Sequence, residues 1–165
     1  MPEHVSSTPD GTNLRFAVIA TTWYPELVER LEAAALDTLR AAGVDDDRIL
    51  VVKVPGAYEL PQAAGWVARA DDVDAIVALG CVIQGETPHF DFVSAACCEG
   101  LMQVALETGV PVGLGVITAN TRDQAEARAS ADAAGKGGNK GIEAADAALR
   151  MARTYQQLEA RRKDS

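Results

Sequence analysis

The sequence predicts an α/β fold, a three-layer αβα sandwich in which a four-stranded parallel sheet lies between two layers of helices. Four short runs of apolar, mostly β-branched residues alternate with segments whose apolar residues recur at helical spacing. The run at residues 75–83 is apolar on both faces of a strand, which indicates a central strand covered by helices on both sides. At 165 residues, 48% of them hydrophobic, the chain has the size of one domain.

Strands and helices alternate along the chain, and two helices close it. The predicted strands are residues 14–22, 48–54, 75–83 and 110–118. The predicted helices are residues 25–42, 57–70, 90–104, 121–129 and 140–159. Proline and glycine mark the early boundaries: Pro25 suits the first turn of a helix, and Gly43 ends that helix. Pro55 and Gly56 halt the second strand, and Pro61 fits only the first turn of the helix after it.

The last third of the chain contains two further strand and helix signals. Gly113 and Gly115 in the fourth strand suggest the close approach of another backbone or of a ligand. Asn120 can cap the short helix that follows, whereas residues 130–141 are too rich in glycine to hold a helix. We therefore divide the chain into a flexible amino-terminal arm at residues 1–13, a single domain at residues 14–158 and a polar tail at residues 159–165.

Charge and composition exclude several classes of function. With 24 acidic and 15 basic residues the net charge is -9, and a nucleic-acid surface needs clustered Lys and Arg instead. No apolar run approaches the roughly 20 residues that span a bilayer, and residues 1–13 lack the apolar segment of a signal peptide. We therefore expect a cytoplasmic protein without membrane or nucleic-acid partners. Cys81, Cys97 and Cys98 lie in apolar segments and show neither a disulfide framework nor metal-ligand spacing.

Residues with useful chemistry follow the strands. Because parallel strands share one polarity, residues beyond their carboxyl ends gather at one edge of the sheet, where ligands bind in open α/β sheets. These positions are Trp23 and Tyr24, residues 56–59, residues 85–89 and, near the fourth strand, Leu114. A tryptophan is more often an ordinary core or rim residue, but the position of Trp23 past a strand end favours stacking on a flat heterocycle. The composition is that of a small-molecule pocket.

The loop after the third strand suggests anion binding and proton transfer. Its backbone N–H groups at the start of a helix would favour an anion such as phosphate, although the Glu86 carboxylate opposes this unless it points away. His89 is the only histidine outside residues 1–13, and histidine exchanges protons near neutral pH. Its position alone leaves proton transfer and helix capping equally open. We discount Cys81 as a nucleophile, because burial in an apolar strand raises the pKa of a thiol.

Four motifs occur together in a fixed order. They are VPGAYELP at residues 54–61, LGCVIQGETPHFDFV at 79–93, GVITANTRDQAEARA at 115–129 and GNKGIEAA at 138–145. In this combination the chain resembles the 6,7-dimethyl-8-ribityllumazine synthase family over about residues 14–158. The resemblance implies a flavodoxin-like fold and a transferase without metal or cofactor. It would condense 5-amino-6-(D-ribitylamino)uracil with 3,4-dihydroxy-2-butanone 4-phosphate, the penultimate step of riboflavin biosynthesis. The alternative is a flavin- or lumazine-binding protein of the same fold with reduced catalysis.

The resemblance also implies a role for each residue of the site. Trp23 would stack on the pyrimidine, and His89 would shuttle protons. The heterocycle and ribityl chain would be bound by Ala57, Tyr58, Glu59, Cys81, Val82, Ile83 and Leu114. The phosphate would be held by Gly85, Glu86, Thr87, Arg128 and Lys140. Arg128 would reach the phosphate from an adjacent subunit. Without the resemblance, its place on a short helix predicts only a solvent-exposed side chain.

Three departures from the family pattern bear on these expectations. Gln84 stands where the family usually has arginine, and Leu114 stands where it often has phenylalanine or asparagine. Leu114 can still contribute a backbone amide, so we expect binding to survive. The loop at residues 130–141 is longer than in many relatives, in a place where pentameric members often carry insertions. We therefore expect a homopentamer with sites shared between neighbours, and a larger pentamer-based assembly as the alternative.

Overall fold

A four-stranded, all-parallel sheet forms the centre of the computed structural model, which describes residues 7–70, 72–130 and 138–165. The strands are β1 (Phe16–Thr21), β2 (Ile49–Val54), β3 (Ala75–Ile83) and β4 (Val112–Ala119). Their order across the sheet is β2-β1-β3-β4, so that β1 and β3 are central. Every residue of β1 is buried, as expected of a strand covered on both faces. The predicted α/β class is confirmed.

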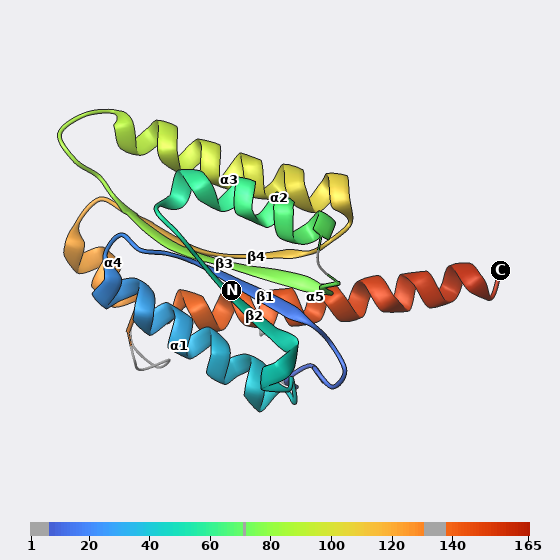
Figure 1. Cartoon of the computed structure of the whole chain (residues 1–165). Coiled ribbons are helices and arrows are strands. Elements are labelled where there is room, and N and C mark those ends of the chain that lie inside the picture. The colour runs from blue at the N-terminus through green and yellow to red at the C-terminus, as the bar shows by residue number, and fades with distance from the viewer. Residues whose placement is uncertain (1–6, 71, 131–137) are drawn as a thin grey trace.

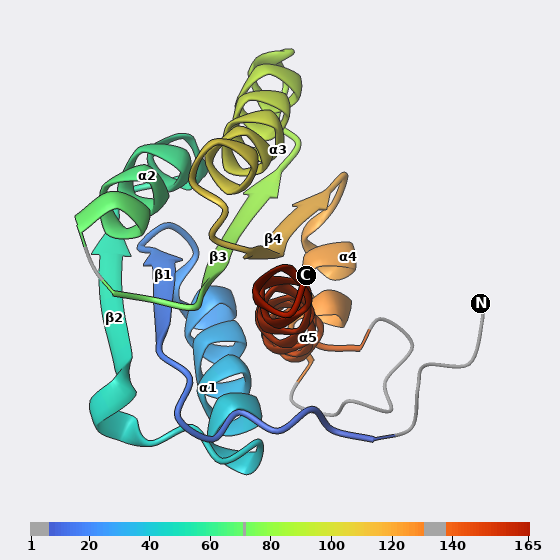
Figure 2. The same cartoon turned by 90° about the vertical axis from the view of Figure 1, so that its right-hand side faces the viewer.

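Helices cover the sheet on both faces (Figure 1). One layer contains α1 (Pro25–Ala41), α4 (Arg122–Arg128) and α5 (Lys140–Lys163), and the other contains α2 (Leu60–Ala70) and α3 (His89–Thr108). Figure 2 views the molecule along α5 and shows the two layers separated by the sheet. Successive β3 side chains alternate between the two cores, because Val77 and Leu79 pack with α1 and α5 while Ile76 and Ala78 pack with α2 and α3.

Glycine allows α5 to approach both the sheet and α1 closely. A Cβ on Gly113 would lie 2.1 Å from the carbonyl oxygen of Ala144 on α5, and one on Gly115 would lie 3.0 Å from the Cβ of the same alanine. A Cβ on Gly141 would lie 2.1 Å from the carbonyl oxygen of Leu31 on α1. The prediction of a close backbone approach is confirmed for Gly113, where the approaching backbone is that of α5. At Gly115 the closest atoms belong to the Leu79 and Ala144 side chains.

The ends of two helices differ from the predictions. Thr121, not Asn120, caps α4, since its hydroxyl accepts the Gln124 N–H at 3.2 Å. The Gln124 side chain in turn accepts a hydrogen bond from the Asn120 N–H at 2.9 Å. This pair of hydrogen bonds resembles a capping box, and the spacing T-x-x-Q in the sequence is typical of that motif. The last helix begins at Lys140 as predicted, capped by Asn139, but continues to Lys163 rather than ending near residue 159. Residues 131–137 of the predicted glycine-rich loop lie outside the described part.

The chain segment before β1 contacts the carboxyl end of α1 and the middle of α5. The Arg153 guanidinium on α5 donates hydrogen bonds to the carbonyl oxygens of Asp10 and Thr12, at 2.6 and 2.9 Å. The Gly11 N–H donates to the Ala42 carbonyl oxygen at 2.7 Å. Residues 1–6 of the predicted arm lie outside the described part.

Candidate active site

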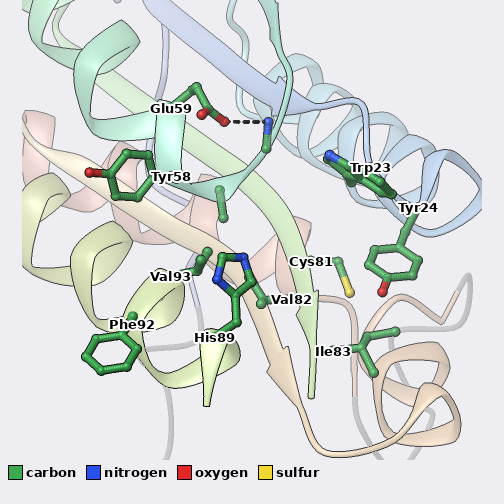
Figure 3. Close-up of a pocket in the computed structure, with 12 residues that line it drawn as sticks. Trp23, Tyr24, Tyr58, Glu59, Cys81, Val82, Ile83, His89, Phe92 and Val93 are labelled. Atoms are coloured by element: carbon green, nitrogen blue, oxygen red, sulfur yellow. Dashed lines mark hydrogen bonds between the residues drawn. The ribbon is translucent and has the colours of Figure 1, made fainter. Parts of the chain in front are cut away.

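The carboxyl ends of β1, β2 and β3 border one cavity of about 590 Å³ (Figure 3). This volume lies within the range of roughly 300–1,000 Å³ that is usual for small-molecule sites. Trp23 and Tyr24 enter the cavity from the connection between β1 and α1, and residues 56–59 enter from the turn between β2 and α2. Cys81, Val82 and Ile83 are the last residues of β3, and His89, Phe92 and Val93 lie on the first turns of α3.

Eight of the predicted site residues therefore line the cavity. They are Trp23, Ala57, Tyr58, Glu59, Cys81, Val82, Ile83 and His89. They come together because three neighbouring strands run parallel, so that chain segments far apart in sequence emerge at the same edge of the sheet.

Large aromatic surfaces face this cavity and are not covered by the chain itself. Trp23, Tyr58 and Phe92 are 68%, 65% and 70% exposed. Trp23 lies against Gly56, where a Cβ would be 3.4 Å from the indole Cδ1. The Gly56 N–H donates a 2.9 Å hydrogen bond to the Glu59 carboxylate, which fixes the turn that carries Tyr58. The arrangement presents a flat ring to a flat ligand beside an anchored carboxylate.

The cavity also contains unpaired polar groups. The Trp23 indole N–H, the Tyr24 and Tyr58 hydroxyls and the His89 imidazole make no hydrogen bond with any other described residue. Each remains available to a ligand, and all four are carried by aromatic rings. A heterocycle with several polar substituents suits such a lining, because its face can stack while its edge makes hydrogen bonds.

The loop between β3 and α3 is fixed at its ends and open between them. The Gln84 N–H donates to the Ala119 carbonyl oxygen at 2.9 Å, and the His89 N–H contacts the Thr87 hydroxyl at 3.4 Å. The N–H groups of Gly85, Glu86 and Thr87 donate to no residue in the described ranges. Backbone N–H groups without a partner just before a long helix can bind an anion, so the geometry of the loop is compatible with phosphate.

Cys81 does not provide a nucleophile. The pKa of its thiol is raised to about 11, chiefly by burial; the Arg122 charge lowers the pKa, and the carboxylates of Glu26 and Glu126 raise it. The neutral thiol therefore predominates near pH 7, as the sequence argument expects. Its contribution to the cavity is a small, weakly polar wall.

Six predicted site residues do not line the cavity of their own chain: Gly85, Glu86 and Thr87, in the loop between β3 and α3, and Leu114, Arg128 and Lys140. Leu114 is the third residue of β4 and pairs with Ala78, so its predicted position at the carboxyl end of the sheet is wrong. The Arg128 guanidinium donates to a carbonyl oxygen of its own helix, that of Gln124, at 2.9 Å. The Lys140 ammonium forms an ion pair with Glu143 at 2.6 Å.

Phe92 and Val93 line the cavity without having been predicted as site residues, and Tyr24, which the sequence placed at this edge of the sheet without a role, lines it as well. Phe92 and Val93 follow His89 by three and four residues, the spacing that places helix side chains on one face, so this signal was present in the sequence. Tyr24 directly follows Trp23, but adjacency does not reveal which way a side chain points.

The described residues contain neither a candidate metal site nor a candidate membrane-spanning helix. No group of three or more His, Cys, Asp or Glu side chains in residues 7–70, 72–130 and 138–165 is arranged to hold a metal ion. No helix in the same ranges is long and apolar enough to cross a bilayer.

Comparison with known proteins gives one consistent result. The family model described as 6,7-dimethyl-8-ribityllumazine synthase matches residues 13–156. Two strains of Nitratidesulfovibrio vulgaris, DP4 and Hildenborough, have proteins of that name that are 44% identical over 149 residues, covering 90% of this chain and 93% of theirs. A protein of the same name from Salinibacter ruber is 45% identical over 159 residues, covering 96% of this chain and 99% of its own length. The chain therefore belongs to the 6,7-dimethyl-8-ribityllumazine synthase family.

Proposed function

We propose that this protein condenses 5-amino-6-(D-ribitylamino)uracil with 3,4-dihydroxy-2-butanone 4-phosphate to 6,7-dimethyl-8-ribityllumazine, releasing phosphate and water. The observation that carries the proposal is the cavity at the carboxyl ends of β1, β2 and β3, in which Trp23, Tyr58, Glu59 and His89 meet. Membership of the synthase family supports this assignment. The family activity is a transferase reaction in riboflavin biosynthesis, and we expect it in the cytoplasm.

The reaction requires binding in a fixed orientation and proton transfer. The substrate amine attacks the ketone, water leaves to form an imine, phosphate is eliminated, and ring closure releases a second water. Trp23 would hold the pyrimidine by stacking, and the Gly85, Glu86 and Thr87 amides would bind the phosphate. His89, whose imidazole is unpaired among the described residues, would carry protons between substrate atoms. Orientation of two bound reactants accounts for a large share of the rate in such reactions.

We further propose that the protein is a homopentamer whose sites are shared by neighbouring subunits, with a larger pentamer-based assembly as the alternative. Leu114, Arg128 and Lys140 lie off the cavity of their own chain, and a neighbour's copies of these residues would complete the site. The Phe92 side chain, which also lines the cavity, stays largely exposed in one chain and leaves room for a neighbouring subunit.

Turnover tests the function directly. The purified protein is incubated with both substrates while lumazine absorbance and released phosphate are followed, and equimolar formation of the two products is expected. Lumazine binding without turnover, by protein of the correct assembled size, would instead favour the binding-protein alternative.

Mixing two inactive variants tests the shared sites. His89→Ala disables the residue that lines the cavity, and Arg128→Ala disables the residue expected from the neighbour. Co-expressed variants should regain part of the wild-type activity, because some sites in a mixed ring combine an intact His89 with an intact Arg128. Activity no higher than that of the separate variants would show that both residues serve the same chain's site, and light scattering gives the size of each assembly.

A further inference from the structure

Tyr24 has a backbone conformation that its residue type seldom adopts. Its φ of 53° and ψ of 58° lie in the left-handed region, which is rare for a bulky side chain. The residue forms the amino-terminal cap of α1 through its carbonyl oxygen, which accepts the N–H groups of Leu27 and Val28, both at 3.0 Å. The Tyr24 side chain makes no capping hydrogen bond. Glycine or asparagine would meet the same backbone requirement with less strain, so capping does not explain the tyrosine.

The Tyr24 side chain has two different surroundings. Its ring packs against the buried cluster between the sheet and α1, and its outer part lines the cavity next to Trp23. Figure 3 shows the hydroxyl directed toward the end of β3, where Cys81 and Ile83 lie. The hydroxyl oxygen has no hydrogen-bond partner in the described part of the chain and is not buried, so it is open to the cavity. Packing explains the ring but leaves the hydroxyl without a function.

We infer that the Tyr24 hydroxyl is a further substrate-binding group, which makes a hydrogen bond to a polar atom of the heterocyclic substrate stacked on Trp23. The left-handed backbone turns two consecutive side chains, Trp23 and Tyr24, into one cavity, so that one holds the face of a flat ligand and the other its edge. Backbone strain of this kind persists where the surrounding structure or the function requires it. The inference rests on the proposed function, because the ligand is the pyrimidine of that reaction.

The heterocycle is a better partner for this group than the phosphate-bearing substrate. A phenol is uncharged and offers a single donor, which suits a carbonyl, ring-nitrogen or hydroxyl acceptor. Phosphate is better bound by several N–H groups together, and the N–H groups of Gly85, Glu86 and Thr87 donate to no residue that the structure describes. Tyr24 therefore contributes to selection of the pyrimidine rather than to anion binding.

Tyr24→Phe is the decisive variant, since it keeps the ring that packs in the core and removes only the hydroxyl. We expect the Kd and KM for 5-amino-6-(D-ribitylamino)uracil to rise by about 5- to 10-fold, the effect of one lost hydrogen bond. The KM for the butanone phosphate, the Kd for inorganic phosphate and the Tm should stay unchanged. Tyr155→Phe, which removes a hydroxyl from a half-exposed residue of α5 outside the cavity, is the matched control and should alter none of these.

The outcomes separate this inference from the proposed function. Unchanged pyrimidine affinity in Tyr24→Phe, measured on a wild-type protein that turns over, overturns the inference and leaves the function intact. An equal loss of phosphate affinity overturns the assignment to the heterocycle. Absence of turnover by the wild type refutes the proposed function, and if the wild type also fails to bind the pyrimidine, the inference fails with it.

Discussion

Removal of the Trp23 side chain should separate ligand binding from folding. The indole is 68% exposed, so only about a third of a side chain that can bury roughly 150–250 Å² contributes to the fold. At about 25 cal/mol per Å² of buried apolar area, Trp23→Ala should lower the free energy of unfolding by only about 1–2 kcal/mol. Stacking of a base-sized heterocycle on an aromatic ring contributes about 1–3 kcal/mol, so the Kd for the pyrimidine should rise roughly 5- to 150-fold.

The chain provides its own control for this experiment. Its only other tryptophan, Trp66, is 64% exposed on α2 and does not line the cavity. Trp66→Ala removes the same side chain at a similar exposure and should leave the pyrimidine Kd unchanged. Trp66→Phe leaves Trp23 as the single indole, so stacking can be followed directly as quenching of its fluorescence during a titration with the pyrimidine. Equal affinities in Trp23→Ala and the wild type, with both assembled alike, would refute the stacking argument.

Three further predictions concern residues at or below the cavity. His89→Ala should lower kcat by about 100-fold or more with little change in either KM, because general acid–base catalysis is lost while binding remains; an unchanged kcat removes His89 from the mechanism. The Cys81 thiol, with its pKa raised to about 11, should react slowly with iodoacetamide at pH 7. The rate, measured by mass spectrometry, should rise about tenfold for each pH unit up to that pKa. A rate that levels off near pH 8 would contradict the effect of burial on the thiol. Thr21→Val should raise the free energy of unfolding, measured in urea, by about 1 kcal/mol, because the Thr21 hydroxyl is buried without a hydrogen-bond partner among the described residues. A loss of stability would show that the hydroxyl does have a hydrogen-bond partner.

Much of the site follows from local patterns because of one general property of parallel sheets. Residues that follow the strands meet at one edge, and this places Trp23, Tyr58 and Ile83 together without knowledge of the strand order. The same reasoning failed for Leu114, because it treated a position in the first half of a strand as though it lay near the end. Pairing with Ala78 settles its position, and that pairing is a tertiary property.

Helix caps show the same division between local and tertiary information. Asn120 and Thr121 both suit a cap, and composition does not decide between them. The hydrogen bonds of Gln124 with both residues decide in favour of Thr121. Gly113 is a similar case. A glycine within a strand predicts that another chain segment approaches closely, but only the packing of α5 on the sheet identifies that segment as Ala144.

The sequence by itself determined the α/β class, the edge of the sheet that holds the site and the family to which the chain belongs, because strand and helix periodicity and motif spacing are properties of neighbouring residues. Only the tertiary structure decided which side chains share the cavity. It added Phe92 and Val93, and it left Arg128 outside the cavity of its own chain. Register, backbone conformation and helix packing fix the directions of side chains, and each depends on contacts between residues that are distant in the sequence.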